Sequence, residues 1–439
     1  MFDLGILNGA VYISGKFLKA NVYIKSGKIC DISRSRLEAK KYYDISGKYL
    51  LPGFIDPHVH FHLDLGNYIS ADDFYSGSIS AAYGGITSYI DFLDPVRTAE
   101  ELERAFEDRL NLAKSSLTDY AFHATIANPT DEPEKILKKA RQLGLSSIKL
   151  FTTYSSSNRR TYDGYIAELL EKSKHYGIVI SVHAENDEII KKYENEEIKV
   201  KDHSKYRPTI TELSEVIKLA EMAEYYNAQL YIVHLTSGKT LDELKKKFNH
   251  ILGKNLVIES CPHYFYFTED IYNTEKGYLY TMTPPLRSKK EKELLIENIN
   301  YINTIGTDHC PFNVEEKKKD IVNGMPMGIG GVEFSFVLMY SMFGKKIIDK
   351  FTKNVAKYYG LKNKGEILPT YDADLVVFDP EKEWIIKEHH SKSDYIPYKD
   401  FRVKGKIIST ISRGKFIVKD GVLNKRVKGS YIKRGEIIW

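Results

Sequence analysis

The stretch Pro52-Gly53-Phe54-Ile55-Asp56-Pro57-His58-Val59-His60 marks the point where the pattern of the sequence changes. Before it, short β-rich runs at residues 5–13, 20–24 and 28–32 are separated by glycines and polar turns, which is typical of antiparallel strands. After it, short apolar runs alternate with longer amphipathic stretches rich in Lys and Glu. This alternation predicts βα repeats that begin at Phe54.

The repeats continue for most of the chain. Eight strand-like runs are found at residues 54–60, 86–92, 120–125, 147–151, 178–183, 230–235, 257–261 and 301–308. Helical patterns lie between most of them, for example at 99–114, 132–143, 165–175 and 212–226. Eight repeats in about 300 residues predict a (β/α)8 TIM-like barrel with its active site at the carboxyl ends of the strands.

The β-rich pattern returns after residue 363, at residues 373–378, 406–413 and 415–419. We therefore expect the two ends of the chain, 1–52 and 363–439, to form one small β-sandwich domain. The barrel would occupy residues 53–362.

Composition narrows the possible partners. The 439 residues are 42% hydrophobic and 28% charged, as in ordinary soluble proteins, and the net charge of +5 is spread along the chain. Without a clustered basic surface we expect no nucleic-acid partner, and no apolar run reaches the ~18 residues of a membrane span. The three cysteines show no disulfide spacing, and the first residues lack the layout of a signal peptide, so we expect a cytoplasmic protein.

Two histidines end the first predicted barrel strand. His58 and His60 are separated by one residue, so their side chains point the same way from a strand. Both imidazoles can therefore reach one ion at the mouth of the barrel. A His-x-His pair alone is a weak signal, and its place on the first strand strengthens it.

Three more polar side chains end predicted strands, namely His183, His234 and Asp308. A lone histidine there is more often a hydrogen-bonded core residue, but four histidines at the same face of one barrel are expected to converge. A carboxylate at position 308 would be costly to bury without a cation or a partner. Together these side chains predict a site for zinc or a similar divalent ion.

Lys149 is a charged residue near the end of an apolar strand. One interpretation places its ammonium group at the barrel rim, with the aliphatic stem on apolar surface. The other places it beside metal charge, where desolvation lowers the pKa of the amine and leaves it nucleophilic. Such an amine can add carbon dioxide and form a carbamate whose two oxygens can bridge two metal ions.

Nine segments, in order, resemble the dihydropyrimidinase–hydantoinase group of the amidohydrolase superfamily. They are Pro52-Gly53-Phe54-Ile55-Asp56-Pro57-His58-Val59-His60, Ser70-Ala71-Asp72-Asp73-Phe74-Tyr75-Ser76-Gly77, Gly84-Gly85-Ile86-Thr87, Ile148-Lys149-Leu150-Phe151-Thr152-Thr153-Tyr154, Val182-His183-Ala184-Glu185-Asn186, Val233-His234-Leu235-Thr236-Ser237, Cys261-Pro262-His263-Tyr264, Pro284-Pro285-Leu286-Arg287 and Thr307-Asp308-His309-Cys310. The resemblance implies a cyclic amidohydrolase that opens a dihydropyrimidine or hydantoin ring to an N-carbamoyl amino acid.

The resemblance also implies how the metal ligands are used. Two divalent ions, zinc by expectation, would be bridged by N6-carboxylated Lys149 and by a hydroxide that attacks the ring amide. One ion would be held by His58, His60 and Asp308, and the other by His183 and His234.

Substrate contacts follow from the same resemblance. Asp308 would act as general base and then as general acid, and Tyr154 would donate to the developing oxyanion. Thr283 and Asn323 would contact the amide edge of the ring, largely through backbone atoms. The alternative for Tyr154 is a surface role, since the chain holds 32 tyrosines.

Other activities stay open. Dihydroorotases are similar too, but they bind the substrate carboxylate through an arginine at the place of His62. The segment Asp72-Asp73-Phe74 and Tyr154 favour dihydropyrimidinase or hydantoinase, whereas the loop Leu63-Asp64-Leu65-Gly66-Asn67 lacks the Pro-Phe pair common in those enzymes. Dihydroorotase and allantoinase are the alternatives. A non-catalytic scaffold is a further one, although all six candidate ligands are present. From the family we expect a homodimer or homotetramer with a small-molecule substrate.

Overall fold

Eight parallel strands curve into a barrel in the computed structural model, which describes residues 1–193, 196–435 and 437. The last strand lies next to the first, since Val59 pairs with His309 and the His60 amide donates to the His309 carbonyl at 2.9 Å. The predicted (β/α)8 barrel is therefore confirmed. Its strands are β6 (Phe54–Val59), β7 (Ile86–Phe92), β8 (Asp119–Thr125), β9 (Ser147–Phe151), β10 (Val179–His183), β11 (Leu230–Ile232), β12 (Leu256–Ser260) and β13 (Thr304–Ile305).

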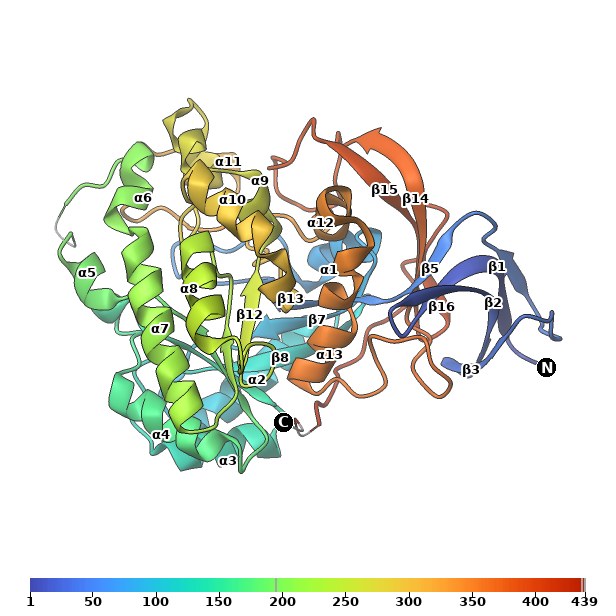
Figure 1. Ribbon diagram of the computed structural model, residues 1–439, viewed down its shortest axis with the longest axis horizontal. Helices are drawn as coiled ribbons and strands as arrows, with labels where there is room; N and C mark the ends of the chain where they lie inside the picture. The colour runs from blue at the N-terminus through green and yellow to red at the C-terminus, as the bar shows by residue number, and fades with distance from the viewer. Residues whose placement is uncertain (194–195, 436, 438–439) are drawn as a thin grey trace.

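Helices surround this barrel (Figure 1). Local signals define several of their ends: Thr98 and Glu101 form a capping box at the start of α2, and Pro133 begins α3. In the described part of the chain no helix is long and apolar enough to cross a membrane. The helices are α1 (Phe74–Tyr83), α2 (Ala99–Ala113), α3 (Pro133–Gln142), α4 (Asp163–Ser173), α5 (Asp187–Lys191), α6 (His203–Tyr206), α7 (Thr209–Tyr225), α8 (Gly238–Phe248), α9 (Pro262–Tyr266), α10 (Lys289–Glu297), α11 (Val314–Lys317), α12 (Ser335–Phe343) and α13 (Lys353–Tyr359).

Two barrel strands are shorter than their apolar runs predict. The run at 230–235 gives only β11, and the run at 301–308 gives only β13. In each case the chain turns into the left-handed region beyond the strand, with φ of 40° at His234 and 48° at Asp308. A residue in that conformation does not continue a β ladder. Both side chains are thus carried by the turns that follow the strands, at the barrel mouth.

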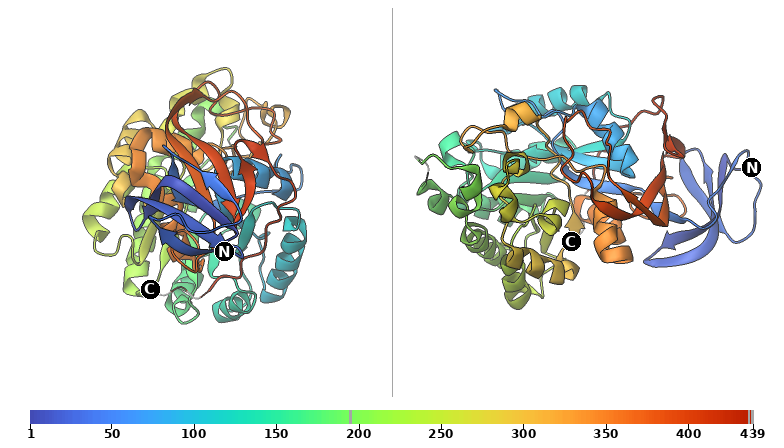
Figure 2. Two further views of the ribbon diagram at one scale, coloured as in Figure 1. Left: turned by 90° about the vertical axis from the view of Figure 1, so that its right-hand side faces the viewer. Right: turned by 90° about the horizontal axis from the view of Figure 1, so that it is seen from above.

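The two ends of the chain share one nine-stranded sheet beside the barrel. Figure 2 shows the blue N-terminal and red C-terminal strands together at one end of the molecule. Antiparallel pairing of Leu375 with Pro52 joins the two halves. The division at residues 52/53 and 362/363 stays a prediction. The strands are β1 (Leu4–Ile13), β2 (Lys16–Lys25), β3 (Lys28–Ser33), β4 (Tyr42–Asp44), β5 (Tyr49–Pro52), β14 (Leu375–Ile385), β15 (Arg402–Ser412), β16 (Lys415–Lys419) and β17 (Val422–Leu423).

The sheet and the barrel are packed together. Phe54 of β6 stacks on Phe336 of α12 with ring centroids 3.9 Å apart, and Phe378 of β14 makes an edge contact with Phe336 at 5.3 Å. Beyond β17 the chain returns to the barrel, where the Tyr120 amide donates to Ser430 and the Ile432 amide donates to Tyr120. Part of the C-terminal stretch therefore lies along β8.

A buried lysine links the two units at the amino end of β8. Lys364 is 5% exposed, and its Nζ lies 3.0 Å from Asp119, 3.2 Å from Asp372 and 2.5 Å from Asp374. Arg413 pairs with Asp119 at 2.9 Å and Lys28 pairs with Asp372 at 2.5 Å, so three cations face the three carboxylates. The cluster therefore joins a barrel strand to the residues that precede β14.

Candidate metal centre

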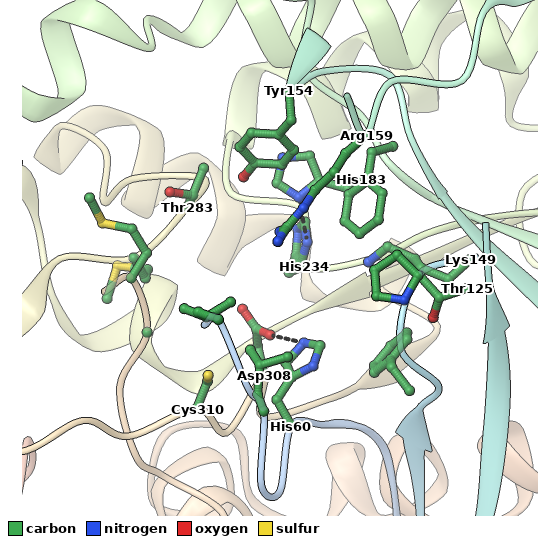
Figure 3. A pocket seen from close by; sticks show the side chains of 18 of the residues that line it. His60, Thr125, Lys149, Tyr154, Arg159, His183, His234, Thr283, Asp308 and Cys310 are labelled. Atoms are coloured by element: carbon green, nitrogen blue, oxygen red, sulfur yellow. Dashed lines mark hydrogen bonds and ion pairs between the residues drawn. The ribbon is translucent and has the colours of Figure 1, made fainter. Parts of the chain in front are cut away.

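Three predicted ligands converge at the carboxyl ends of β6 and β13. His58 Nε2 and His60 Nε2 lie 3.2 Å apart, and each is 3.1 Å from Asp308 Oδ1. Figure 3 shows His60 and Asp308 pointing toward each other at the floor of the pocket. His58 is fully buried. The ligand atoms of the three residues form one compact group of nitrogen and oxygen donors.

Two further histidines meet across the cavity. His183 Nδ1, at the end of β10, lies 3.1 Å from His234 Nε2. The other nitrogen of His183, Nε2, is 2.8 Å from the Glu185 carboxylate, which also binds Arg207 at 2.7 Å. Because a carboxylate accepts, His183 carries its proton on Nε2, and its Nδ1 lone pair is directed toward His234 Nε2.

Glu259 orients the first group in the same way. Its Oε1 lies 2.8 Å from His58 Nδ1 and accepts the His234 amide at 3.1 Å. The Nδ1 proton of His58 is thus held by Glu259, and Nε2 is the ring nitrogen directed toward the other ligands. Carboxylates in this outer position fix the tautomer and ring orientation of metal-binding histidines.

Lys149 enters the cavity from β9 with no ionic partner among the described residues. It is 3% exposed, and its Nζ lies over the rings of Phe92 and Phe151, 5.1 and 5.4 Å from the centroids. Burial lowers the pKa of Lys149 to about 8, although the charges of Asp308 and Glu259 oppose the shift. The rim interpretation of Lys149 does not describe this buried side chain.

These side chains surround one cavity of about 290 Å³. Tyr154, Thr283 and Arg159 form another part of its wall, and the Tyr154 hydroxyl points toward Thr283 (Figure 3). Burial raises the pKa of Tyr154 to about 12, against the opposing charge of Arg207, so the phenol keeps its proton at neutral pH. The loop residues Leu63, Asp64 and Leu65 close the wall near His60.

Asn323 lies apart from this cavity. It is exposed and borders a neighbouring cavity of about 350 Å³, which shares Tyr154 and Thr283 with the first. Its side-chain amide bonds to the chain at Glu196 and Ile198, with 3.1 and 2.9 Å contacts. The side chain is therefore engaged in loop structure, and only the backbone of Asn323 is free for other contacts.

The turns that carry the ligands are held by further buried polar groups. Asp72 accepts from His309 Nε2 at 2.9 Å and from the Lys392 amide at 2.9 Å, and Ser391 donates to the same carboxylate. Asp56 accepts from the Thr307 amide and hydroxyl at 3.1 and 2.6 Å. These contacts fix the turn of Asp308 against β6 and against the loop that follows β14.

Sequence reasoning missed the groups that orient the ligands. Glu259 directly follows the apolar run Leu256-Val257-Ile258 of β12, and a carboxylate at that place in a barrel strand is a usable signal. Glu185 lies within a motif that was recognised, but its contact with His183 was not predicted. No sequence signal indicates that Arg207 reaches Glu185, since 22 residues separate them.

Residues 49–417 match the Amidohydrolase family. The chain belongs to that family. It is 32% identical over 461 residues to D-hydantoinase from Geobacillus stearothermophilus, covering 98% of this chain and 96% of the relative. A crystal structure of D-hydantoinase matches with a TM-score of 0.93 at 30% identity, over 100% of both chains. The structure of dihydropyrimidinase from Brevibacillus agri NCHU1002 matches with a TM-score of 0.90 at 28% identity, also over 100% of both.

Membership of the amidohydrolase family implies a hydrolase with a binuclear divalent metal centre, and the donor set here fits one. The ligand atoms of His58, His60 and Asp308 all lie within 4.8 Å of one another. His183 and His234 direct ring nitrogens toward each other, and the buried Nδ1 of His234 has no hydrogen-bond partner among the described residues. Imidazole nitrogen and carboxylate oxygen are the ligands that zinc and similar ions take in hydrolases.

Proposed function

We propose that the protein hydrolyses a cyclic amide, a dihydropyrimidine or hydantoin ring, to an N-carbamoyl amino acid. One arrangement supports this most: four histidines, an aspartate and a buried lysine surround a single cavity whose wall also carries a protonated tyrosine. The names of the relatives, D-hydantoinase and dihydropyrimidinase, point to the same class of ring.

Two divalent ions would complete the site, and we propose zinc. Imidazole and carboxylate ligands suit zinc, and the carboxylates behind His58 and His183 resemble the outer partners of zinc-bound histidines. When bound, the ions supply Lewis acidity and a water nucleophile of lowered pKa. One ion would be held by His58, His60 and Asp308, the other by His183 and His234, with carboxylated Lys149 shared between them.

Carboxylation of Lys149 is supported by its surroundings. The lysine is buried with no ionic partner in the described chain, and its lowered pKa of about 8 leaves a larger fraction of neutral amine than an exposed lysine has. The Nζ–carbon bond forms when that amine adds to carbon dioxide, and one proton is released. The product carries the negative charge that a site with two cations needs.

Asp308 and Tyr154 would carry the proton transfer and the charge of the reaction. Asp308 Oδ1 faces His60, which leaves Oδ2 toward the cavity to take a proton from the attacking water (Figure 3). Tyr154 donates its hydroxyl proton in a hydrogen bond to the carbonyl oxygen as negative charge develops there. Asp308 then gives its proton to the ring nitrogen as the C–N bond breaks.

Thr283 and Asn323 would bind the amide edge of the ring. Thr283 lies opposite the Tyr154 hydroxyl and can contact a ring held there. For Asn323 we propose contact through backbone atoms, since its side chain bonds to residues 196 and 198.

Hydrolysis of four rings by metal-replete protein tests the function. We expect 5,6-dihydrouracil or hydantoin to be opened faster than dihydroorotate or allantoin, followed as loss of each ring. Preference for dihydroorotate or allantoin would still indicate hydrolysis of a cyclic amide, but would assign the protein as a dihydroorotase or an allantoinase. No turnover of any of the four, together with no bound metal after purification without chelators, would favour the scaffold alternative and overturn the proposal.

We also propose a cytoplasmic homodimer or homotetramer. The three cysteines are free, two of them buried, which suits a reducing compartment. Light scattering coupled to size-exclusion chromatography measures the assembly, and a monomer at working concentration would contradict this part.

A further inference from the structure

Arg159 reaches into the catalytic cavity from the loop after β9. It lines the cavity with Tyr154, His183 and Asp308, and Figure 3 shows its guanidinium directed toward the middle of the pocket. The loop that carries it is anchored, because the Arg159 amide donates to Tyr154 at 3.0 Å and the Thr161 amide to Phe151 at 2.8 Å. The side chain therefore starts from a defined backbone position beside the proposed oxyanion donor.

The Arg159 guanidinium has no hydrogen-bond or ion-pair partner in the part of the chain that the structure describes. Its neighbour Arg160 differs, with ion pairs to Asp187 and Glu188 at 3.2 and 2.6 Å. Arg207 is likewise paired with Glu185 at 2.7 Å. A planar guanidinium offers five donors that match a carboxylate in a bidentate pair, so an unpaired one in a cavity wall is suited to an anionic ligand.

The other charged groups of the cavity do not compete for this role. Asp308 Oδ1 is engaged with His58 and His60 at 3.1 Å. Asp64 is exposed at the rim, and its Oδ1 accepts the Gly66 amide at 2.7 Å. Lys149 is the other lining cation among the described residues, and the proposed function converts it to a carbamate. Much of the remaining wall is apolar, including Leu63, Leu65, Met282, Met325 and Met327.

We propose that the ring opened by this enzyme carries a carboxylate substituent and that Arg159 binds it. This inference rests on the proposed function and names its substrate class: an acidic hydantoin or an acidic dihydropyrimidine. The expected arginine of a dihydroorotase is absent at His62, and Arg159 supplies the same chemistry from a different loop. Its role is in specificity, since it would touch the substituent and not the reacting amide.

The test compares each acid with its neutral amide isostere. The pairs are 5-(carboxymethyl)hydantoin with 5-(carbamoylmethyl)hydantoin, and 5-(carboxymethyl)-5,6-dihydrouracil with 5-(carbamoylmethyl)-5,6-dihydrouracil. We expect kcat/KM for the acid of at least one pair to exceed that for its amide by about 10- to 100-fold, the size of one charge-assisted bidentate contact. In Arg159→Gln this ratio falls toward one, whereas Arg159→Lys keeps part of it.

Arg104→Gln is the matched control. It removes the same charge from an exposed position on α2, where the Arg104 side chain is 67% exposed, and we expect the acid-to-amide ratio to stay unchanged. Equal loss of acid and amide hydrolysis in Arg159→Gln, or a wild-type preference for both amides, would overturn the inference.

Calorimetric titration of the two acids into wild type and Arg159→Gln separates this inference from the proposed function. If no ring is opened but an acid binds at least about 10-fold more weakly to Arg159→Gln, the function fails and the carboxylate site stands. If rings are opened but neither acid depends on Arg159 for binding or turnover, the site fails and the function stands. If neither acid binds wild type and no ring is opened, both are overturned.

Discussion

Two buried lysines at opposite ends of the barrel behave in opposite ways. Lys149 at the mouth is 3% exposed and has no ionic partner among the described residues, and burial lowers its pKa to about 8. Lys364 at the base is 5% exposed and contacts three carboxylates. Burial disfavours its charge too, but Asp374, Asp119 and Asp372 outweigh burial and raise the pKa of Lys364 above its usual value.

The difference separates a buried lysine whose positive charge stabilises the fold from a buried lysine whose amine we expect to take part in the chemistry. At the base, the carboxylates hold Lys364 as a cation and join the barrel to the terminal sheet. At the mouth, the Asp308 carboxylate is engaged with His58 and His60, so Lys149 has no ion-pair partner among the described residues and we expect its amine to be reactive. Substitution of Lys149 should therefore reduce metal binding and activity, whereas substitution of Lys364 should reduce the free energy of unfolding.

The largest effect is expected for Lys149→Ala. Removal of the shared ligand should lower bound metal and reduce kcat/KM by at least about 10³-fold, because several kcal/mol of transition-state stabilisation depend on the metals. Folding, followed by circular dichroism, should be retained. Protein loaded in ¹³C-bicarbonate should show a carbamate carbon signal by NMR that the variant lacks. Full activity with unchanged metal content would rule out the carbamate.

Lys364→Met should give the largest loss of stability. It leaves Asp374 buried without its cation, while Asp119 keeps Arg413, so we expect the free energy of unfolding to fall by about 3–5 kcal/mol in denaturant titration. Lys28→Met is the control, since Lys28 pairs with Asp372 at 2.5 Å but is 44% exposed, and a loss below about 1 kcal/mol is expected. If the free energy of unfolding fell equally in the two variants, the buried ion pairs of Lys364 would contribute no more to stability than the exposed pair of Lys28.

Tyr154→Phe should raise the barrier of ring opening by about 2–4 kcal/mol through loss of one oxyanion donor. The decrease should be seen in kcat and kcat/KM alike, with metal content unchanged. Tyr162→Phe, at a nearby residue that is 56% exposed, should leave both parameters as they are. An increase in KM alone would assign Tyr154 to ground-state binding.

The smallest effect is expected for Glu259→Gln. The amide would no longer hold the His58 ring as a carboxylate does, so metal affinity should fall about 10- to 100-fold in competition with a chelating dye. Glu243→Gln on the surface of α8 is the matched control, with no change expected. Unaltered affinity in Glu259→Gln would show that His58 is oriented by other contacts.

The barrel and most of the candidate ligands could be predicted from the sequence because both depend on local pattern. Alternating apolar runs indicate the strands, and polar residues at their ends mark the mouth. Two strands end earlier than their runs suggest, since the left-handed turns at His234 and Asp308 depend on tertiary contacts. The sequence does not predict that the Arg159 side chain points into the cavity, because this depends on how the loop after β9 is anchored.

The Asp72 contacts bear on how this enzyme could be recombined with its relatives. Asp72 receives hydrogen bonds from His309, next to Asp308, and from Ser391 and Lys392, which come from the loop beyond β14. A chimera that exchanges only the barrel would separate this carboxylate from two of its donors and loosen the turn that carries Asp308. Crossovers should therefore transfer residues 389–393 together with the barrel. Asp72 then keeps its hydrogen bonds from Ser391 and Lys392, and the turn of Asp308 stays in place.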